Sequence, residues 1–361
     1  MSDLAKRLHD DNIIYMHDLS AYASGQHNCL TLSLDGVLKD GVKFTQTDLR
    51  PAQSIGTAMQ IAAIVVQSVS QVQFGGCSIN HIDTSFAPYV TKSYQKWLRE
   101  LGDEALAWRL TEKETYQSAE GLVHNFCSLQ SRSGNQLPFS SINLGLDTTR
   151  EGRLVTRAIL TAVNNGTGKA GRTALFPNVM FQRYSKVNAK PGTPNYDLYR
   201  LAIETSAKRL WPTYLMVDNY RGYDPTDVRT TPSAMGCRTQ FMGSDINHDA
   251  NCPEYARDSR GNICPVTIIL PTIAMMADRD PAKFKQLLAE QINNARTILK
   301  ERYQYIVTRD VHSCPFITEN NLFEGFDGKS LINPKQIRLV HELWAPTEKE
   351  VRQAEAMVSA F

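Results

Sequence analysis

Hydrophobic residues along the chain repeat with two different periods, which predicts strands and helices in succession. Residues 29–34 alternate with period two and lead into Asp35-Gly36, which predicts a strand followed by a turn. Residues 54–73 are rich in Ala, Ile, Val and Gln and lead into Gly75-Gly76, which predicts a buried helix with a glycine stop. Residues 174–181 predict a buried strand. Such alternation is typical of an α/β architecture.

The C-terminal third continues the pattern. Residues 266–270 lie between Pro265 and Pro271 and are mostly apolar on both faces, which predicts a covered parallel strand. Asp280-Pro281 predicts a helix start, because Asp caps free N–H groups and Pro fits the first helical position. Helical spacing then connects side chains that we expect to face the core, namely Phe284, Leu287, Leu288, Ile292, Ala295, Ile298, Leu299 and Tyr303.

Composition and charge narrow the function classes. At 361 residues the chain can bury a sizeable core as one large domain or two ordinary ones. Its net charge of +2 gives no basic field and no support for nucleic-acid binding. Residues 1–11 lack the apolar core of a signal peptide, and no apolar run reaches the roughly 18–20 residues that span a bilayer. We therefore expect a cytoplasmic protein with no membrane partner.

The cysteines do not suggest a disulfide framework or a metal centre. They stand at positions 29, 77, 127, 237, 252, 264 and 314. Their odd number and the absence of a CxxC pair argue against structural disulfides. Cys252 and Cys264 lack the close-spaced partners of a zinc site, so we predict no bound metal.

Cys237 has an unusual setting. It lies between Gly236 and Arg238 and follows Thr231-Pro232-Ser233, which favours a turn that thrusts a side chain outward. A cysteine on a rigid loop tip suits one-electron chemistry, because the thiol hydrogen is easily lost and regained. The alternative is a small buried hydrophobe.

Motifs spread along the chain share one family pattern. They occupy residues 14–20, 25–29, 50–51, 71–76, 131–138, 140–143, 194–200, 235–239 and 260–263. Together they closely resemble the anaerobic, glycyl-radical (class III) ribonucleoside-triphosphate reductases, in order and nearly continuously from about residue 11 to about residue 321. The resemblance implies an α/β fold, a partial ten-stranded α/β barrel of the glycyl-radical enzyme and ribonucleotide reductase type.

The resemblance also implies three catalytic residues. Ribonucleotide reduction removes an unactivated hydrogen from the ribose 3′ carbon, which a shielded thiyl radical can do. Cys237 is then the radical cysteine, on a finger loop inside the barrel, and it stands singly where pyruvate formate-lyase has two adjacent cysteines. Cys29 matches the second family cysteine, on the opposite face of the sugar, with a buried structural thiol as the alternative. Asn262 matches an asparagine whose amide bonds a ribose hydroxyl and cannot act as a strong base.

Other polar groups in the resembling segments are candidates for lining the substrate pocket. They are His17, His27, Asn28, Gln71, Gln73, Asn143, Ser233 and Arg238. For each of them, a satisfied buried polar residue is the alternative interpretation.

Further components follow from the family. The catalytic trio favours formate as reductant over a thioredoxin-type protein, and the full-length family responds to ATP and dNTP effectors. The chain lacks the family's ATP-cone and its Arg-Val-Cys-Gly-Tyr type loop, so we expect the glycyl radical to come from a missing segment or a partner chain. A radical-SAM activating enzyme and a homodimer are the expected protein partners.

The C-terminal tail has a different resemblance. Residues 325–337 and 345–351 are similar to the end of citrate lyase β-subunit and related CoA-ester lyases. We therefore predict a reductase barrel portion at 1–322 and a lyase-like tail at 323–361. Two alternatives stay open: an inactive fragment or recombined fusion that at most binds nucleotide, and, more remotely, a CoA-ester lyase.

Overall fold

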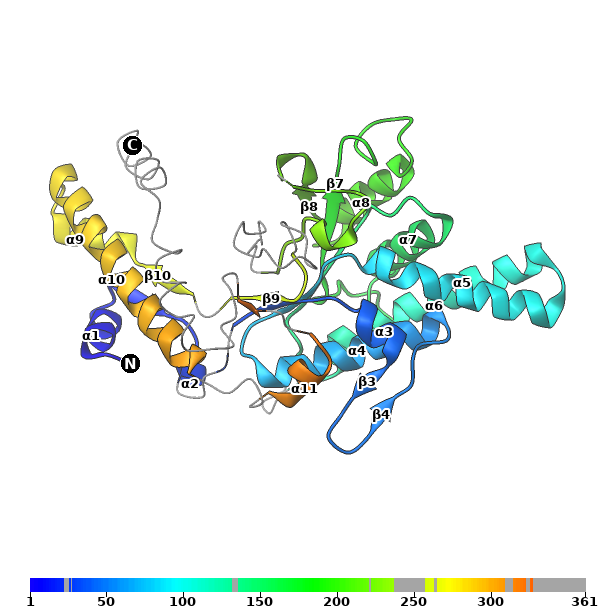
Figure 1. Ribbon diagram of the computed structural model, residues 1–361. Helices are drawn as coiled ribbons and strands as arrows, with labels where there is room; N and C mark the ends of the chain where they lie inside the picture. Colours follow the sequence, from blue (N-terminus) through cyan, green and yellow to red (C-terminus); the bar gives the residue numbers. More distant parts are fainter. Residues whose placement is uncertain are drawn as a thin grey trace.

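A seven-stranded sheet forms the centre of the molecule. The computed structural model describes residues 1–22, 26, 28–131, 136–220, 222–236, 257–262, 265–308, 314–322 and 325–326. The strand order is β11-β9-β2-β5-β6-β7-β8 (Figure 1). The strands are β2 (Leu30–Leu32), β5 (Cys77–Ile79), β6 (Ser140–Leu144), β7 (Asn178–Arg183), β8 (Thr213–Met216), β9 (Arg260–Gly261) and β11 (Gly325–Phe326). Strands β2, β5, β6, β7 and β8 run parallel to one another, whereas β9 is antiparallel to β2.

One face of this sheet packs on the helices that connect its strands. They are α3 (Asp35–Asp40), α4 (Ile55–Val72), α5 (Ile82–Leu101), α6 (Glu104–Ser128), α7 (Arg150–Asn165) and α8 (Tyr196–Lys208). Ile79, Ile142 and Phe181 of the strands share one hydrophobic core with Phe86 of α5 and Ile159 of α7. This helix-covered face accounts for the alternation of strand and helix patterns in the sequence.

The opposite face carries polar side chains in register. Thr31, Ser78, Ser141 and Asn178 lie opposite one another on four neighbouring parallel strands. All four are buried. Buried polar groups require hydrogen-bond partners, so a polar segment of the chain must cover this face.

The sheet confirms the expected fold class. Its parallel strands, with helices on one face and polar side chains on the other, are those of a partial α/β barrel. Within the described residues the sheet is open, because no strand pairs β8 with β11.

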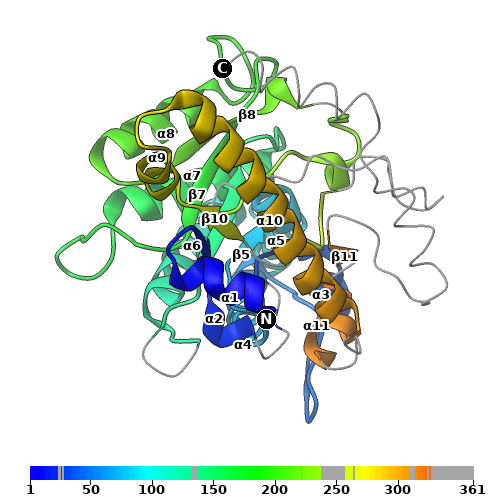
Figure 2. The same cartoon turned by 90° about the vertical axis from the view of Figure 1, so that its left-hand side faces the viewer.

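A second, smaller unit contains both the N-terminal helix and the long C-terminal helix pair (Figures 1 and 2). It consists of α1 (Asp3–Asp10), β1 (Ile14–Met16), β10 (Val266–Ile268), α9 (Leu270–Ala277) and α10 (Pro281–Val307). The prediction of a covered parallel strand at 266–270 was wrong. Within the described residues, strand β10 pairs antiparallel with β1 in a two-stranded sheet. Its side chains are half-buried or exposed, and residue 270 already begins α9.

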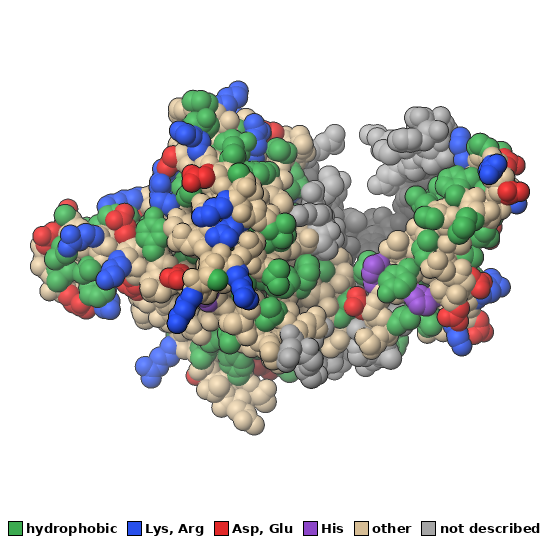
Figure 3. All heavy atoms as spheres, turned by 180° about the vertical axis from the view of Figure 1, so that it is seen from behind, with side chains coloured by type: hydrophobic (Ala, Val, Ile, Leu, Met, Phe, Trp, Pro, Cys, Tyr) green, Lys and Arg blue, Asp and Glu red, His purple; other side chains and the backbone are tan. Residues whose placement is uncertain are grey.

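Helix α10 begins as predicted but buries a different stripe. The Asp280 carboxylate accepts the backbone N–H of Ala282 at 2.8 Å, which caps the helix. Ile298 is fully buried, whereas Ile292 and Leu299 are 49% and 37% exposed. Exposed hydrophobic side chains lie over α9 and α10 (Figure 3), and they include Leu270, Met275, Met276, Ile292 and Leu299. The expected core stripe is therefore only partly correct.

Helix α4 confirms the buried helix predicted at 54–73. Ser54 caps it by accepting the N–H of Thr57 at 3.2 Å. Among the described residues it is the one helix long and apolar enough to cross a membrane, contrary to the expectation that no such run exists. Of that window 56% is buried within the structure, where Ile61 and Val65 belong to the main core.

The remaining elements are short. They are α2 (Leu19–Tyr22), β3 (Val42–Lys43), β4 (Asp48–Leu49), α11 (Pro315–Glu319) and two 3-10 turns, η1 (Val217–Asn219) and η2 (Val228–Thr230). The turn predicted at Asp35-Gly36 is instead the start of helix α3. The strand predicted at 174–181 begins only at Asn178, because Pro177 has no N–H to donate to the sheet.

Candidate functional site

The segment 231–236 crosses the polar face of the sheet and is bonded to strand β6. The side chain of Asn143 accepts the backbone N–H of Ala234 at 2.9 Å and donates to the Ala234 carbonyl at 3.1 Å. The same amide group donates to the hydroxyl of Ser78 and to the Ile79 carbonyl, both at 3.1 Å. A fully buried asparagine thus fixes the backbone of this segment to two strands.

Neighbouring strands add further anchors. The Ser141 hydroxyl accepts the N–H of Gly236 at 3.1 Å, and the Gln182 amide donates to the Pro232 carbonyl at 2.6 Å. A Cβ at Gly236 would come within 2.6 Å of the Asn178 amide nitrogen and 2.7 Å of the Phe139 ring. Glycine is therefore required at this close approach. Cys237 itself lies outside the described residues, immediately after this anchored segment.

Cys29 lies at the start of β2 and beside the anchored segment. Its side chain is 5% exposed and packs against Met235 in a small buried cluster. The N–H of Gly76 donates to its sulfur at 3.3 Å. The neighbouring Gly75 N–H donates to the Asn28 carbonyl at 2.8 Å, so the glycine pair of the 75–76 turn packs directly on residues 28–29. Met235 lies two residues from Cys237, which brings the two candidate cysteine segments together.

Asn262 holds the backbone of residues 28–29 at three points. Its side-chain oxygen accepts the N–H of Cys29 at 2.9 Å. Its backbone N–H donates to the Cys29 carbonyl, and its carbonyl accepts the N–H of Asn28, each at 3.0 Å. The side-chain oxygen thus accepts a hydrogen bond from Cys29, and the NH₂ group of the same amide can donate to a ligand.

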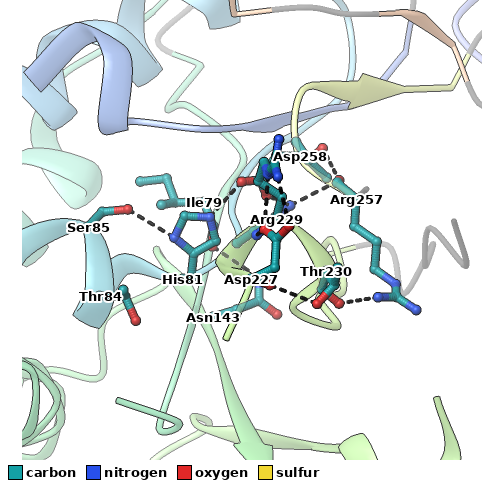
Figure 4. A network of polar contacts seen from close by, with 12 residues as sticks. Ile79, His81, Thr84, Ser85, Asn143, Asp227, Arg229, Thr230, Arg257 and Asp258 are labelled. Carbon is teal, nitrogen blue, oxygen red and sulfur yellow. Dashed lines mark hydrogen bonds and ion pairs between the residues drawn. The ribbon is translucent and has the colours of Figure 1, made fainter. Parts of the chain in front are cut away.

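A buried ion pair lies just before Asn262 in the chain (Figure 4). Nε2 of His81, after strand β5, is 2.6 Å from Oδ2 of Asp258. Nδ1 of His81 is 3.0 Å from the Ser85 hydroxyl, and the Asn80 amide donates to Oδ1 of Asp258 at 2.5 Å. Burial alone would lower the pKa of His81, but the charge and hydrogen bond of Asp258, with smaller contributions from the carboxylates of Asp35 and Asp83, raise it to about 9.

The structure assembles some of the predicted site residues and separates others. Asn28, Cys29, Asn143 and Ser233 are buried around the polar face. Gln73 is buried as well, and its amide donates to the Gly76 carbonyl at 2.9 Å, so it shapes the glycine turn beside Cys29.

Two other predicted residues lie elsewhere. Gln71 is exposed at the end of α4. Nε2 of His17 is 2.8 Å from the Thr267 hydroxyl in the small sheet. His27 and Arg238, like Cys237, lie outside the described residues. The roles assigned to all of these positions stay predictions. Within the described part of the chain, no cluster of three or more His, Cys, Asp or Glu side chains could hold a metal ion.

The sequence analysis missed the anchoring side chains. Ser78, Ser141, Asn178 and Gln182 were not proposed, although each sits at an alternate position within an apolar strand. Polar residues on one face of several successive apolar strands are a detectable signal for a polar barrel interior. His81 and Asp258 gave no such signal, since 177 residues separate them.

Comparison with known proteins identifies the family. The parallel sheet with its helix-covered outer face and polar inner face defines an α/β barrel-type fold, and solved structures of anaerobic ribonucleotide reductases share that fold. The anaerobic ribonucleotide reductase from Thermotoga maritima with citrate in the active site superposes with a TM-score of 0.61 at 16% identity, over 89% of this chain and 56% of that chain. The complex of the Thermotoga maritima enzyme with dATP and CTP gives 0.59 at 14% identity, over 89% of this chain and 53% of that chain.

Sequence comparison is more specific. Residues 1–335 match the family described as anaerobic ribonucleoside-triphosphate reductase, and the chain belongs to that family. The relative from Salmonella typhimurium is 35% identical over 302 residues, which are 81% of this chain and 41% of the relative. The relative from Enterobacteria phage T4 is 31% identical over 280 residues, which are 74% of this chain and 44% of the relative. The chain thus spans less than half the length of the curated relatives it matches.

A short second similarity agrees with the expectation for the tail. The chain is 64% identical over 36 residues to citrate lyase subunit beta of Haemophilus influenzae, which is 10% of this chain and 12% of that protein. Residues 327–361 lie outside the described part of the structure, so the predicted boundary at 322/323 stays a prediction.

Proposed function

We propose that this chain is the substrate-binding half of an anaerobic ribonucleotide reductase barrel, which binds ribonucleoside triphosphates and takes part in their reduction to deoxyribonucleotides. The observation that carries the proposal is the anchored 231–236 segment. Asn143 and Ser141 hold its backbone on the barrel interior, and Met235 packs against Cys29. This arrangement supports a Cys237 side chain on the interior side, near Cys29.

The proposed reaction assigns one task to each candidate. A glycyl radical, carried by another segment or chain, supplies the unpaired electron. Cys237 exchanges a hydrogen atom with the ribose 3′ carbon, and Cys29 assists reduction at the 2′ carbon. Formate is the two-electron reductant. The 2′ C–O bond breaks and a C–H bond forms at that carbon, formate is oxidised to carbon dioxide, and the hydroxyl takes up one proton from solvent and leaves as water.

The proposed role of Asn262 is to donate a hydrogen bond to a hydroxyl group of the ribose. Its NH₂ group can donate to a ribose hydroxyl while its oxygen keeps the Cys29 backbone in place. The amide has no basic lone pair at neutral pH, so it orients the sugar without taking a proton. The neighbouring residues Asn28, Cys29 and Arg260 are buried, and Asn262 itself is half-buried at their edge.

Turnover in the presence of a radical-bearing partner tests the proposal. Supplied with that partner, its activating enzyme and formate, the protein should convert ribonucleoside triphosphates to deoxyribonucleotides. Cys237→Ser should abolish conversion, because a serine O–H bond is too strong for the hydrogen exchange. Full turnover in the serine variant would refute the assignment. Effector binding, a homodimer and a cytoplasmic location are further proposals from the family. The first two can be tested with the purified chain, and the location by cell fractionation.

A paired substitution separates the two functions of Asn262. Asn262→Asp keeps an oxygen that can accept the Cys29 N–H, but replaces the sugar-facing donor with an acceptor. We expect this variant to fold normally and to lose turnover by about a hundredfold or more. Asn262→Ala removes both groups and should also loosen residues 28–29. Equal turnover in the Asp variant and the unaltered protein would contradict the proposed role.

A further inference from the structure

The segment Arg257–Asn262 connects the two halves of the candidate site. At its end, Asn262 bonds the backbone of Cys29. At its start, the Arg257 N–H donates to the Arg229 carbonyl at 2.9 Å, and its guanidinium donates to the Thr230 carbonyl. Thr230 leads directly into the 231–236 segment that precedes Cys237. The Arg257–Asn262 segment therefore contacts both the backbone of Cys29 and the backbone that leads into the 231–236 segment.

Two strands of the sheet fix the middle of this connecting segment. The hydroxyl of Thr31 lies 3.1 Å from the carbonyl oxygens of both Arg257 and Arg260 and accepts the Arg260 N–H at 2.9 Å. The Asn80 amide donates to the Arg257 carbonyl at 3.1 Å. Between these contacts, Ser259 adopts a left-handed backbone with φ of 56°, which is costly for a residue with a side chain and must be held by its neighbours.

The ionic anchor of the connecting segment is Asp258. Both of its carboxylate oxygens are used, one by Asn80 and one by His81. His81 is 2% exposed, and its second ring nitrogen faces Ser85 on helix α5 (Figure 4). A buried carboxylate in this position would be costly without an opposite charge, because burial disfavours an unpaired ion.

We propose that His81 and Asp258 form a charged positioning pair that holds the Arg257–Asn262 segment, and through it sets Asn262 against Cys29. His81 acts through Asp258 and touches no reacting atom. The importance of the pair for catalysis rests on the proposed function. Its effect on the backbone of Cys29 is independent of that function. Asp258 is the carboxylate in contact with the imidazole, and the charges of Asp258, Asp35 and Asp83 all raise the pKa of His81.

Hydrogen exchange in the full chain tests the positioning pair. The probes are the amides of Asn28, Cys29 and Asn262, which the structure bonds across this contact. Asp258→Asn keeps the shape of the side chain but removes its charge and replaces one of the two accepting oxygens with an NH₂ donor. We expect these amides to exchange about tenfold faster or more in the variant at pH 7, while helix α7 amides exchange at the unaltered rate.

A matched control removes a carboxylate from an ion pair elsewhere. Asp197 accepts from Arg153 and Arg157 at 2.9 and 2.7 Å on the outer helices, and Asp197→Asn should leave exchange at residues 28–29 unchanged. Equal exchange at the probe amides in Asp258→Asn and in the unaltered protein would overturn the proposal.

The pH profile distinguishes a charged pair from simple packing. In the unaltered protein, protection of the Cys29 amide should fall in a step as pH rises through about 9, beyond the ordinary acceleration of exchange by base. The step should be absent in Asp258→Asn and in His81→Gln, which keeps a donor but cannot ionise. A step that persists in His81→Gln would overturn the proposal, even if Asp258→Asn fails to fold.

Binding of CTP to the unaltered chain is measured separately. A failure of the proposed function can therefore be distinguished from a failure of the positioning pair.

Discussion

Substitution of Asn143 by leucine tests how the interior loop is held. Leucine has the same branching and the same number of side-chain heavy atoms as asparagine but a larger volume, so the change removes hydrogen bonds without opening a cavity. Asn143 is fully buried and makes contacts of 2.9 to 3.1 Å with Ala234, Ser78 and Ile79. The Ser78 hydroxyl also donates to the Ala234 carbonyl at 3.2 Å, so that oxygen keeps one partner. The Ala234 N–H loses the bond that the structure gives it.

The magnitude follows from these contacts. One buried N–H left without its partner costs about 1–3 kcal/mol, and the weakened bonds to Ile79 and Ser78 add about 1 kcal/mol more. We therefore expect Asn143→Leu to lower the free energy of unfolding by about 2–4 kcal/mol, a large part of the roughly 5–15 kcal/mol typical of a domain. The loop should also detach locally, because its anchor is lost.

Urea unfolding at pH 7, combined with exchange of the Ala234 amide, measures both effects. The matched control is Asn125→Leu, whose exposed amide makes one long contact of 3.5 Å with Gln60. That control should change the free energy of unfolding by less than about 0.5 kcal/mol. If Asn143→Leu is as stable as the control and keeps the Ala234 amide protected, the inferred anchoring is wrong.

Other predictions concern the ion pair and the two glycine contacts. Because the pKa of His81 is raised to about 9 from 6.5, its contribution to stability is fully present below about pH 6.5 and is lost as pH rises through 9. Urea titrations across that range should show a decline on the order of 3 kcal/mol, and Asp258→Asn should remove it. Gly75→Ala would place a Cβ within 2.5 Å of the Asn28 carbonyl, and thermal unfolding should show a loss of about 1–3 kcal/mol. Gly236→Ala should weaken CTP binding, measured by calorimetry, at temperatures where the variant is still folded. An unchanged affinity would argue against a role of the 231–236 segment in the binding site.

Local physics explains which parts of the fold could be predicted. Helix α4 and the start of α10 follow from Ser54 and Asp280, because caps and periodicity act within a few residues. The strand at 266–270 was misjudged, because an apolar run does not reveal whether its partner is a central strand or the edge strand β1.

The candidate site shows the same limit at longer range. Cys29 and Asn262 were proposed together through the family resemblance, and the structure places them in direct contact. The contact between His81 and Asp258 depends on the sheet order, which brings β5 and β9 to either side of β2. No local pattern encodes that order. The polar residues from Thr31 to Asn178 were visible one by one within apolar segments and were missed, whereas the row that they form depends on strand register.

Activity of a chimeric reductase tests the central claim most directly. Residues 1–322 of this chain would replace the corresponding region of the Salmonella typhimurium relative, and formation of the glycyl radical, measured by electron paramagnetic resonance, would show that the chimera is folded and activated. We predict that the activated chimera converts CTP to dCTP with formate, and that Cys237→Ser in the chimera keeps the radical signal but makes no dCTP. A radical-bearing chimera that makes no dCTP, or that makes as much with Cys237→Ser, would contradict the account.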